Sequence, residues 1–172
     1  TLIYAQWSEG FRLGRGQKLP PPDLCDVDNN NELDFNTGGI LTTVVTPDTT
    51  ENIELGLKLS LLDQRLTVNT AIFQTDWDNL PVAIQPKDST PPCIQGITNN
   101  IGSAQTEGVE LEVNYYMDSW LLNLTASYVD TKWTEARAPI EVGEPLIYVP
   151  RTNANLGLQY NFMFGEYSSF IR

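Results

Sequence analysis

Strict alternation of apolar and polar residues is the feature of this sequence that most constrains how the chain folds. In the alternating segments, 22 of 23 positions on one side are apolar, against 3 of 18 on the other. Side chains alternate between the two faces of a β-strand, so this pattern predicts antiparallel sheet with one apolar and one polar face. The segments are residues 53–59, 66–72, 109–117, 120–128 and 154–162.

The links between these segments are of two kinds. The short links are residues 63–64, 118–119 and 164–167, and the long links, rich in Pro and Asn, are residues 10–50, 79–102 and 135–150. If the chain zigzags, all short turns lie at one end of the sheet and all long loops at the other. Transmembrane β-barrels of bacterial outer membranes have this asymmetry, with short periplasmic turns and longer extracellular loops. We therefore expect an all-β fold, an antiparallel transmembrane β-barrel segment with about seven long strands.

A soluble β-sandwich is the alternative, because its strands also have one apolar face. However, segments 103–117 and 120–134 are longer than an average strand, which has about 5 or 6 residues. Both are long enough to cross a bilayer, which takes about 9–11 residues. Aromatic residues also gather near both ends of the segments, as in the interfacial girdles of membrane barrels. Near the short turns these are Tyr115, Trp120, Tyr160 and Phe162, and near the long loops Trp7, Trp77 and Trp133.

Composition excludes several classes of protein. The chain has no histidine, which removes the commonest general base, the Ser-His-Asp and Cys-His arrangements, and His-ligated metal sites. It carries 22 acidic and 10 basic residues, a formal charge of −12, which repels phosphate and argues against nucleic-acid binding. No apolar run is longer than four residues, the length of the run at residues 146–149, whereas a membrane-spanning helix needs about 20. An enzyme is therefore the least expected class.

Several stretches of sequence, taken in order and spacing, resemble the barrel of TonB-dependent outer-membrane receptors. Each stretch is loose on its own, but together they cover nearly the whole chain. They are Ser8-Glu9-Gly10-Phe11-Arg12, residues 51–58 (ENIELGLK), residues 69–73 (NTAIF) leading to Asp76-Trp77, residues 100–104 (NIGSA) leading to residues 108–112 (GVELE), and Val149-Pro150-Arg151 followed by residues 155–160 (NLGLQY).

This resemblance implies an active importer in the outer membrane of a Gram-negative bacterium. Such a barrel has roughly 22 strands around an N-terminal plug, so residues 1–172 would be a partial barrel domain from its later half. The implied partners are outer-membrane lipid, the plug domain of the full-length chain, TonB acting through that plug, and a scarce solute. By family frequency this solute is a ferric siderophore. A small complete barrel acting as anchor or passive pore remains the other membrane alternative.

Four charged residues follow the polar side of the alternation, namely Glu54, Lys58, Glu110 and Glu112. On a barrel strand this side faces the lumen. They are either solvated lumen charges paired across neighbouring strands or contacts that help to hold and release the plug. The spacing of Glu110 and Glu112 simply follows the strand period, so it gives no support to glycosidase chemistry.

Residues in and beside the expected loops are candidates for contact with a solute. Arg12, Arg15 and Lys18 form a basic cluster at a loop mouth, which either meets an anionic ligand or balances the acidic stretch that follows. Trp77 and Asp78 lie at the top of an expected strand. They are either girdle residues or part of a ligand platform.

The first long loop holds two further features. Cys25 lies in this loop and Cys93 in the second, on the same side of the sheet, which favours a disulfide in an oxidising extracellular setting over two free thiols. Asp26, Asp28, Asn30 and Glu32 have the alternate spacing that opens a calcium loop. Asn31 and Thr37 replace the glycine and glutamate of an EF-hand, so loop 26–34 is either a calcium site or a solvated acidic loop. No other cofactor is expected.

Overall fold

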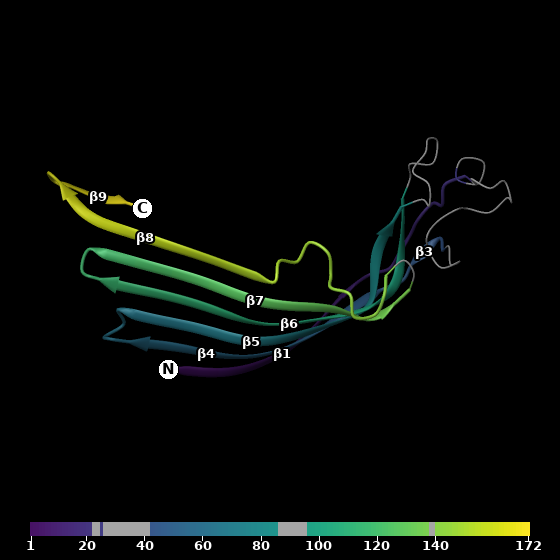
Figure 1. The fold of residues 1–172 in the computed structure, drawn as a ribbon, viewed down its shortest axis with the longest axis horizontal. Coiled ribbons are helices and arrows are strands. Elements are labelled where there is room, and N and C mark those ends of the chain that lie inside the picture. The colour runs from purple at the N-terminus through teal and green to yellow at the C-terminus, as the bar shows by residue number, and fades with distance from the viewer. Residues whose placement is uncertain (22–24, 26–41, 86–95, 138–139) are drawn as a thin grey trace.

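The computed structural model describes residues 1–21, 25, 42–85, 96–137 and 140–172. Seven strands form one antiparallel sheet in the order β1-β4-β5-β6-β7-β8-β9 (Figure 1), and β2 and β3 form a separate pair. The strands are β1 Leu2–Arg12, β2 Arg15–Gly16, β3 Val44–Val45, β4 Asp48–Leu61, β5 Leu66–Ile84, β6 Ile97–Met117, β7 Trp120–Ala136, β8 Thr152–Phe164 and β9 Tyr167–Ile171. Among the described residues, no helix is long and apolar enough to span a membrane. The predicted antiparallel sheet of about seven strands is confirmed.

The short turns all lie at one end of this sheet (Figure 1). Residues 62–65 join β4 to β5, residues 118–119 join β6 to β7, and residues 165–166 join β8 to β9. Left-handed backbone at Asp118 and Gly165, with φ of 50° and 61°, reverses the chain within two residues. The strand ends that the longer connections join, such as Ile84 on β5 and Ile97 on β6, lie toward the opposite end, so the predicted asymmetry between the two ends is confirmed.

The pairing register places the apolar residues of neighbouring strands on a common face. Leu55 on β4 lies opposite Ala5 on β1 and Ile72 on β5. Ile72 lies opposite Val109 on β6, and Val109 lies opposite Tyr128 on β7. We call this side of the sheet the apolar face. The side that carries the intervening residues is the polar face.

The apolar face is not covered by a second sheet in the part of the chain that the structure describes. Ile53, Leu55 and Ile72 on this face are 61%, 49% and 56% exposed. A β-sandwich would bury these rows against an opposing sheet. The sandwich alternative is therefore wrong for the described strands. The sheet is also open, since β1 and β9 form its two edges instead of pairing with each other.

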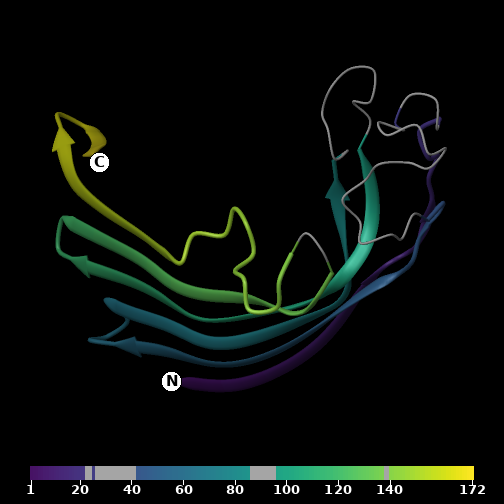
Figure 2. The same ribbon diagram turned by 45° about the vertical axis from the view of Figure 1, so that its right-hand side comes forward.

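The polar face lies on the concave side of the sheet. Figure 2 shows the sheet bending, with the connection between β7 and β8 on its concave side. The backbone N–H of Leu146 in this connection donates to Oγ1 of Thr131, at 3.0 Å. Thr131 belongs to the polar face, because it lies four residues along β7 from Ser127, which is the partner of Glu110, and every second residue of a strand faces the same side.

The apolar face becomes polar at a comparable level on neighbouring strands. With distance from the short turns, the change is from Ile53 to Glu51 on β4, from Val109 to Glu107 on β6 and from Tyr128 to Asp130 on β7. The apolar stretches are residues 53–61, 109–117 and 120–128. Each is close to the about 9–11 residues with which a tilted strand crosses a bilayer. The sheet thus carries an apolar band of nearly constant height, which suits a membrane-facing wall.

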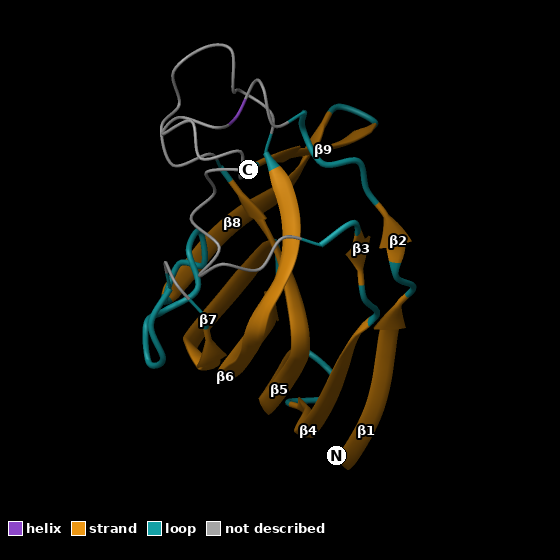
Figure 3. Cartoon of the chain, turned by 90° about the vertical axis from the view of Figure 1, so that its right-hand side faces the viewer, coloured by secondary structure: helices purple, strands orange, loops and turns teal. Residues whose placement is uncertain are grey.

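Two of the three long loops are shorter than predicted. β5 continues to Ile84 and β6 begins at Ile97, inside the expected loop 79–102 (Figure 3). Asn79 has a φ of 59°, and the register shifts between Trp77 and Leu80 and again before Pro81, which breaks the alternation and hid the strands from it. In the expected loop 10–50, β1 continues to Arg12, β4 begins at Asp48, and β2 and β3 lie between them. The third loop, 135–150, agrees within two residues.

The buried core lies at the loop end of the sheet, beyond the apolar band. Its members are Cys25, Leu80, Ile84, Ile97, Ile101, Ala104 and Trp133, with Leu19, Trp77, Ile140 and Leu146 packed against them. Trp133 is only 5% exposed. The girdle prediction for Trp133 is therefore wrong, because this residue packs inside the buried core at the loop end of the sheet and does not face its surroundings. Trp7, by contrast, is 61% exposed on the apolar face, as a girdle residue would be.

Candidate functional site

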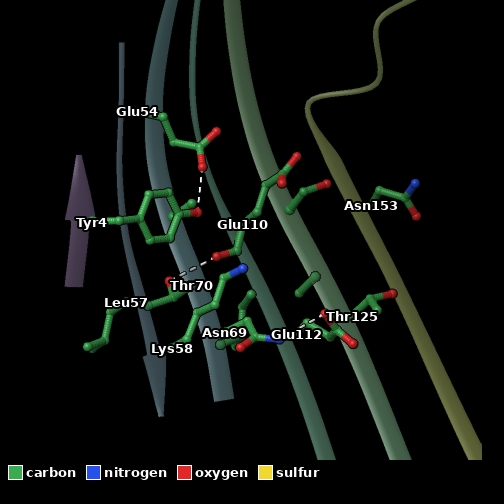
Figure 4. Close-up of a pocket in the computed structure, with 14 residues that line it drawn as sticks. Tyr4, Glu54, Leu57, Lys58, Asn69, Thr70, Glu110, Glu112, Thr125 and Asn153 are labelled. Atoms are coloured by element: carbon green, nitrogen blue, oxygen red, sulfur yellow. Dashed lines mark hydrogen bonds between the residues drawn. The ribbon is translucent and has the colours of Figure 1, made fainter. Parts of the chain in front are cut away.

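The four charged residues predicted on the polar face come together around one concavity. This concavity has a volume of about 380 Å³ and opens on the polar face between β1 and β8 (Figure 4). Glu54 and Lys58 reach it from β4, and Glu110 and Glu112 from β6. Tyr4 and Asn69 add a phenol and an amide to its wall. The alternation thus located this site, because it sorted these side chains from the apolar face.

Tyr4 connects two of these charges. Its ring lies over Gly56, the residue opposite it on β4, where an added Cβ would come within 2.1 Å of the ring. The Tyr4 hydroxyl donates to Oε1 of Glu54 at 2.5 Å, and the ammonium of Lys58 lies 5.4 Å from the ring centroid. Sequence reasoning missed Tyr4. The available signal was Gly56, a gap in the polar row that a neighbouring ring could fill.

Amide groups hold the carboxylate of Glu112. Nδ2 of Asn114 donates to Oε1 at 2.9 Å, and Nδ2 of Asn69 on β5 donates to Oε2 at 3.2 Å. Asn123 on β7 in turn donates to Oδ1 of Asn114, so the network crosses three strands. These bonds hold the Glu112 side chain in place as a hydrogen-bond acceptor on the concave surface.

Glu110 and Lys58 differ from Glu112, because neither side chain has a hydrogen bond to another side chain among the described residues. Neither side chain forms an ion pair with another residue in the described ranges, where the ion pairs are Arg12 with Asp48 and Arg151 with Asp130. The cross-strand ion pairing considered for these residues is therefore not what the structure has. The concavity carries three carboxylates and one ammonium, and is suited to bind a cationic or hydrogen-bond-donating surface.

A second polar group, at the loop end of the polar face, is built on Asp48. Arg12 lies directly opposite Asp48 in the register and donates from Nε, at 3.1 and 3.0 Å, and from Nη2, at 2.7 Å. Nε1 of Trp77 donates to the same carboxylate at 2.6 Å, and the Arg12 guanidinium lies 4.9 Å from the Trp77 ring centroid. We call these residues the Arg12–Asp48–Trp77 triad.

Burial and hydrogen bonding act in opposite directions on Asp48. The residue is 4% exposed, and burial alone would raise the pKa of its carboxyl. The hydrogen bonds from Arg12 and Trp77 outweigh burial, and the pKa of Asp48 lies below its usual value. Asp48 is thus a permanent anion at neutral pH. It lies five residues beyond the apolar band on β4.

The predicted basic cluster does not form a single site. Arg12 is paired with Asp48, whereas Nη2 of Arg15 donates to Oγ1 of Thr98 at 3.3 Å. Lys18 is exposed. Charge spacing along the sequence suggested one cluster, but strand pairing gives each arginine a different neighbour.

Trp77 and Asp78 lie on opposite faces of the sheet, because consecutive strand residues point to opposite faces. Trp77 lies opposite Thr50 on the polar face, which makes the girdle reading of Trp77 wrong. Asp78 lies opposite Thr49 on the other face and lines a separate cavity of about 430 Å³ with Asn79 and Glu135.

The base of the first long loop is tied to β6 by a side-chain amide. Nε2 of Gln17 donates to the carbonyl of Thr98 at 2.6 Å, and the N–H of Thr98 donates to Oε1 of Gln17 at 2.9 Å. Gln17 thereby imitates a paired strand residue. This contact holds β2 and β3 against the extended part of β6.

Cys25 is disulfide-bonded and only 1% exposed within the buried core at the loop end of the sheet. Cys93 lies outside the described residues, so its pairing with Cys25 stays a prediction. Asp26, Asp28, Asn30 and Glu32, the predicted calcium ligands, also lie outside the described residues.

Residues 1–170 match the family described as TonB dependent receptor-like, beta-barrel. A curated relative, the probable TonB-dependent siderophore receptor PiuA of Acinetobacter baumannii, is 27% identical over 109 residues. That alignment covers 63% of this chain and 13% of the relative. The chain therefore spans about an eighth of this relative's length.

Solved structures share the fold at low sequence identity. The ferric yersiniabactin uptake receptor FyuA from Yersinia pestis matches with a TM-score of 0.66 and 16% identity, over 96% of this chain and 21% of that one. The siderophore receptor PiuA from Acinetobacter baumannii matches with a TM-score of 0.60 and 22% identity, over 92% and 21%. The pyoverdine outer membrane receptor FpvA from Pseudomonas aeruginosa PAO1 matches with a TM-score of 0.59 and 21% identity, over 93% and 20%. The sheet is thus arranged like the matching fifth of each of these chains.

Proposed function

Because this chain belongs to the TonB-dependent receptor-like β-barrel family, we propose that it forms part of the barrel wall of a receptor that imports a ferric siderophore. Its seven strands would supply roughly a third of a 22-stranded barrel. The receptor would lie in the outer membrane of a Gram-negative bacterium. The short turns would face the periplasm and the long connections the exterior.

The observation that carries this proposal is the apolar band. Its rows are exposed, end at a comparable level on β4, β6 and β7, and give way to carboxylates and amides on the same face. Uncovered apolar rows are costly in water but favourable against lipid tails. The apolar face is therefore assigned to outer-membrane lipid and the concave polar face to the lumen.

The siderophore is proposed from the relatives. The matched receptors are named for siderophores, ferric yersiniabactin and pyoverdine. These proteins are named as transport receptors and not as enzymes, so we assign a binding and transport role without catalysis. The printed names differ in their solute, and the present assignment stays at the class of ferric siderophores.

The concavity around Glu110 is assigned to the plug domain of the full-length chain. Three carboxylates and Lys58 on a rigid wall would bind basic and polar groups of the plug. TonB would act on the plug and not on this chain. When the plug moves, Glu110 and Lys58 can exchange partners easily, because neither is tied to a described neighbour by an ion pair.

The loops are assigned to capture of the solute outside the cell. We propose that Cys25 and Cys93 form the disulfide, which would fasten the first loop to the β5–β6 connection. Calcium binding by residues 26–34 is a further proposal that would stiffen the first loop.

Uptake of radioactive iron by bacteria that carry the full-length receptor tests this function. Strains with and without the receptor gene, and with and without TonB, would be supplied with a panel of ferric siderophores under iron limitation. We expect uptake of at least one siderophore that needs both the receptor and TonB. Receptor-dependent uptake without TonB would favour a passive pore, and no effect on iron uptake would reject the proposal.

A further inference from the structure

The Arg12 guanidinium is only partly used by its contacts within the fold. A guanidinium has five N–H donors in one plane. Asp48 occupies the edge formed by Nε and Nη2, through three contacts of 2.7 to 3.1 Å. Nη1 has no hydrogen bond to a described residue. The second edge, formed by Nη1 and the outer hydrogen of Nη2, therefore remains available to another acceptor.

The plane of this guanidinium is held from two directions. Asp48 fixes one edge, and the Trp77 ring supports one face at 4.9 Å. The same Asp48 carboxylate also accepts the indole N–H of Trp77, so the ring and the carboxylate hold each other. A cation fixed in this way loses little side-chain entropy when it binds a ligand.

The two partners of the ion pair differ in burial. The side chain of Asp48 is 6% exposed, whereas that of Arg12 is 57% exposed. The carboxylate is thus fixed inside the fold, while the guanidinium that it holds reaches solvent. All three residues lie on the polar face, beyond the apolar band and thus at the external mouth of the proposed barrel.

We infer that Arg12 is a specificity-determining residue that binds a carboxylate of the imported ferric chelate, and that Asp48 and Trp77 are its positioning residues. This inference rests on the proposed function. A carboxylate matches the free edge with two parallel N–H···O contacts, as in other bidentate arginine sites. The chain has a formal charge of −12, which repels an anionic solute, and the free N–H edge of Arg12 would offset part of this repulsion by direct hydrogen bonding.

The inference is tested on the purified full-length receptor in detergent by equilibrium binding of ferric chelates. The panel pairs chelates that keep a free carboxylate, such as ferric citrate, with chelates that lack one, such as a ferric trihydroxamate. The variant Arg12→Lys keeps the charge beside Asp48 but loses the planar fork. Arg12→Gln removes the charge, and Trp77→Phe keeps the ring but removes the donor to Asp48. Arg151→Lys changes the exposed ion pair with Asp130 and is the matched control.

We expect wild-type receptor to bind a carboxylate-bearing chelate. Arg12→Lys and Arg12→Gln should raise the Kd for this chelate by about ten- to a hundredfold, as for loss of hydrogen bonds to a charged group. Trp77→Phe should weaken it several-fold and reduce the preference for carboxylate-bearing over carboxylate-free chelates, which a general loss of stability would not do. Arg151→Lys should bind as wild type does.

Two results would overturn the inference while leaving the proposed function intact. One is wild-type binding restricted to chelates without a carboxylate. The other is an unchanged Kd in a correctly folded Arg12→Lys receptor. If wild-type receptor binds no ferric chelate, the proposed function is itself wrong, and the inference is rejected with it.

Discussion

Gly56 lies directly opposite Tyr4 in the β1–β4 register, and the Tyr4 ring fills the space that a side chain at position 56 would need. The contact links an edge strand to the wall of charges on the polar face. A glycine inside a strand ordinarily weakens the strand, but Gly56 leaves the space in which the Tyr4 ring lies and from which its hydroxyl bonds Glu54.

Replacing Gly56 should displace this ring. In Gly56→Ala the new Cβ would lie 2.1 Å from Tyr4 Cζ, so the ring must move and its hydrogen bond to Glu54 is lost. We expect a loss of about 1–3 kcal/mol in unfolding free energy, typical of overpacking, measured by denaturant unfolding of the full-length receptor. Gly157→Ala is the matched control, because its Cβ would meet nothing closer than 3.6 Å. Equal effects at the two glycines would contradict this account.

The stability contributed by Asp48 should depend on pH. Its pKa is lowered in the folded protein, so its contribution is complete above the ordinary pKa of an aspartate and is lost as pH falls through the lowered value. Wild type should be more stable than Asp48→Asn by about 2 kcal/mol at pH 7, as expected for hydrogen bonds to a charged group. The difference should shrink toward pH 3. A difference that is constant between pH 7 and pH 3 would show that the ionised carboxylate is not what stabilises the fold.

Trp133 should stabilise the packing at the loop end of the sheet, and we expect no contact between it and lipid. It is 5% exposed in the core with Cys25 and Ile101, so Trp133→Ala should cost about 3–5 kcal/mol locally. Limited proteolysis of intact cells should then cut the loops faster. Trp7→Ala, at a residue 61% exposed on the apolar face, should leave loop cleavage unchanged. Unaltered cleavage in Trp133→Ala would contradict the packing described.

The disulfide predicts a specific chemical result. Thiol labelling of the native full-length receptor should modify neither Cys25 nor Cys93, and a peptide linking residues 25 and 93 should appear in mass spectra until a reductant is added. Detection of free Cys93 in the native protein would show that Cys25 pairs elsewhere.

Alternation predicted the strands, their two faces and the short turns, because each depends only on residues close together in sequence. Residue parity also carried unused information. Counting on from Leu121 places Trp133 on the polar face, and counting on from Asn69 does the same for Trp77, in agreement with the register. Proximity to loops suggested girdles for both, and parity was the better guide.

The remaining differences follow from contacts that are distant in sequence. Arg12 and Asp48 are separated by 36 positions across a long connection, so their pairing depends on a strand register that alternation does not supply. The continuation of β5 was hidden by the left-handed Asn79 and by Pro81, which are typical of loops. For the same reason the two arginines of the expected basic cluster could not be assigned to different partners.

The central claim is that the apolar face contacts hydrocarbon and the polar face contacts the lumen. Spin labels placed in turn at residues 53 to 58 of the full-length receptor, without native cysteines and in lipid bilayers, test it most directly. The account predicts that accessibility to oxygen peaks at positions 53, 55 and 57, and that accessibility to a water-soluble nickel complex or burial by the plug marks positions 54, 56 and 58. Equal access of the nickel complex to all six positions would contradict it.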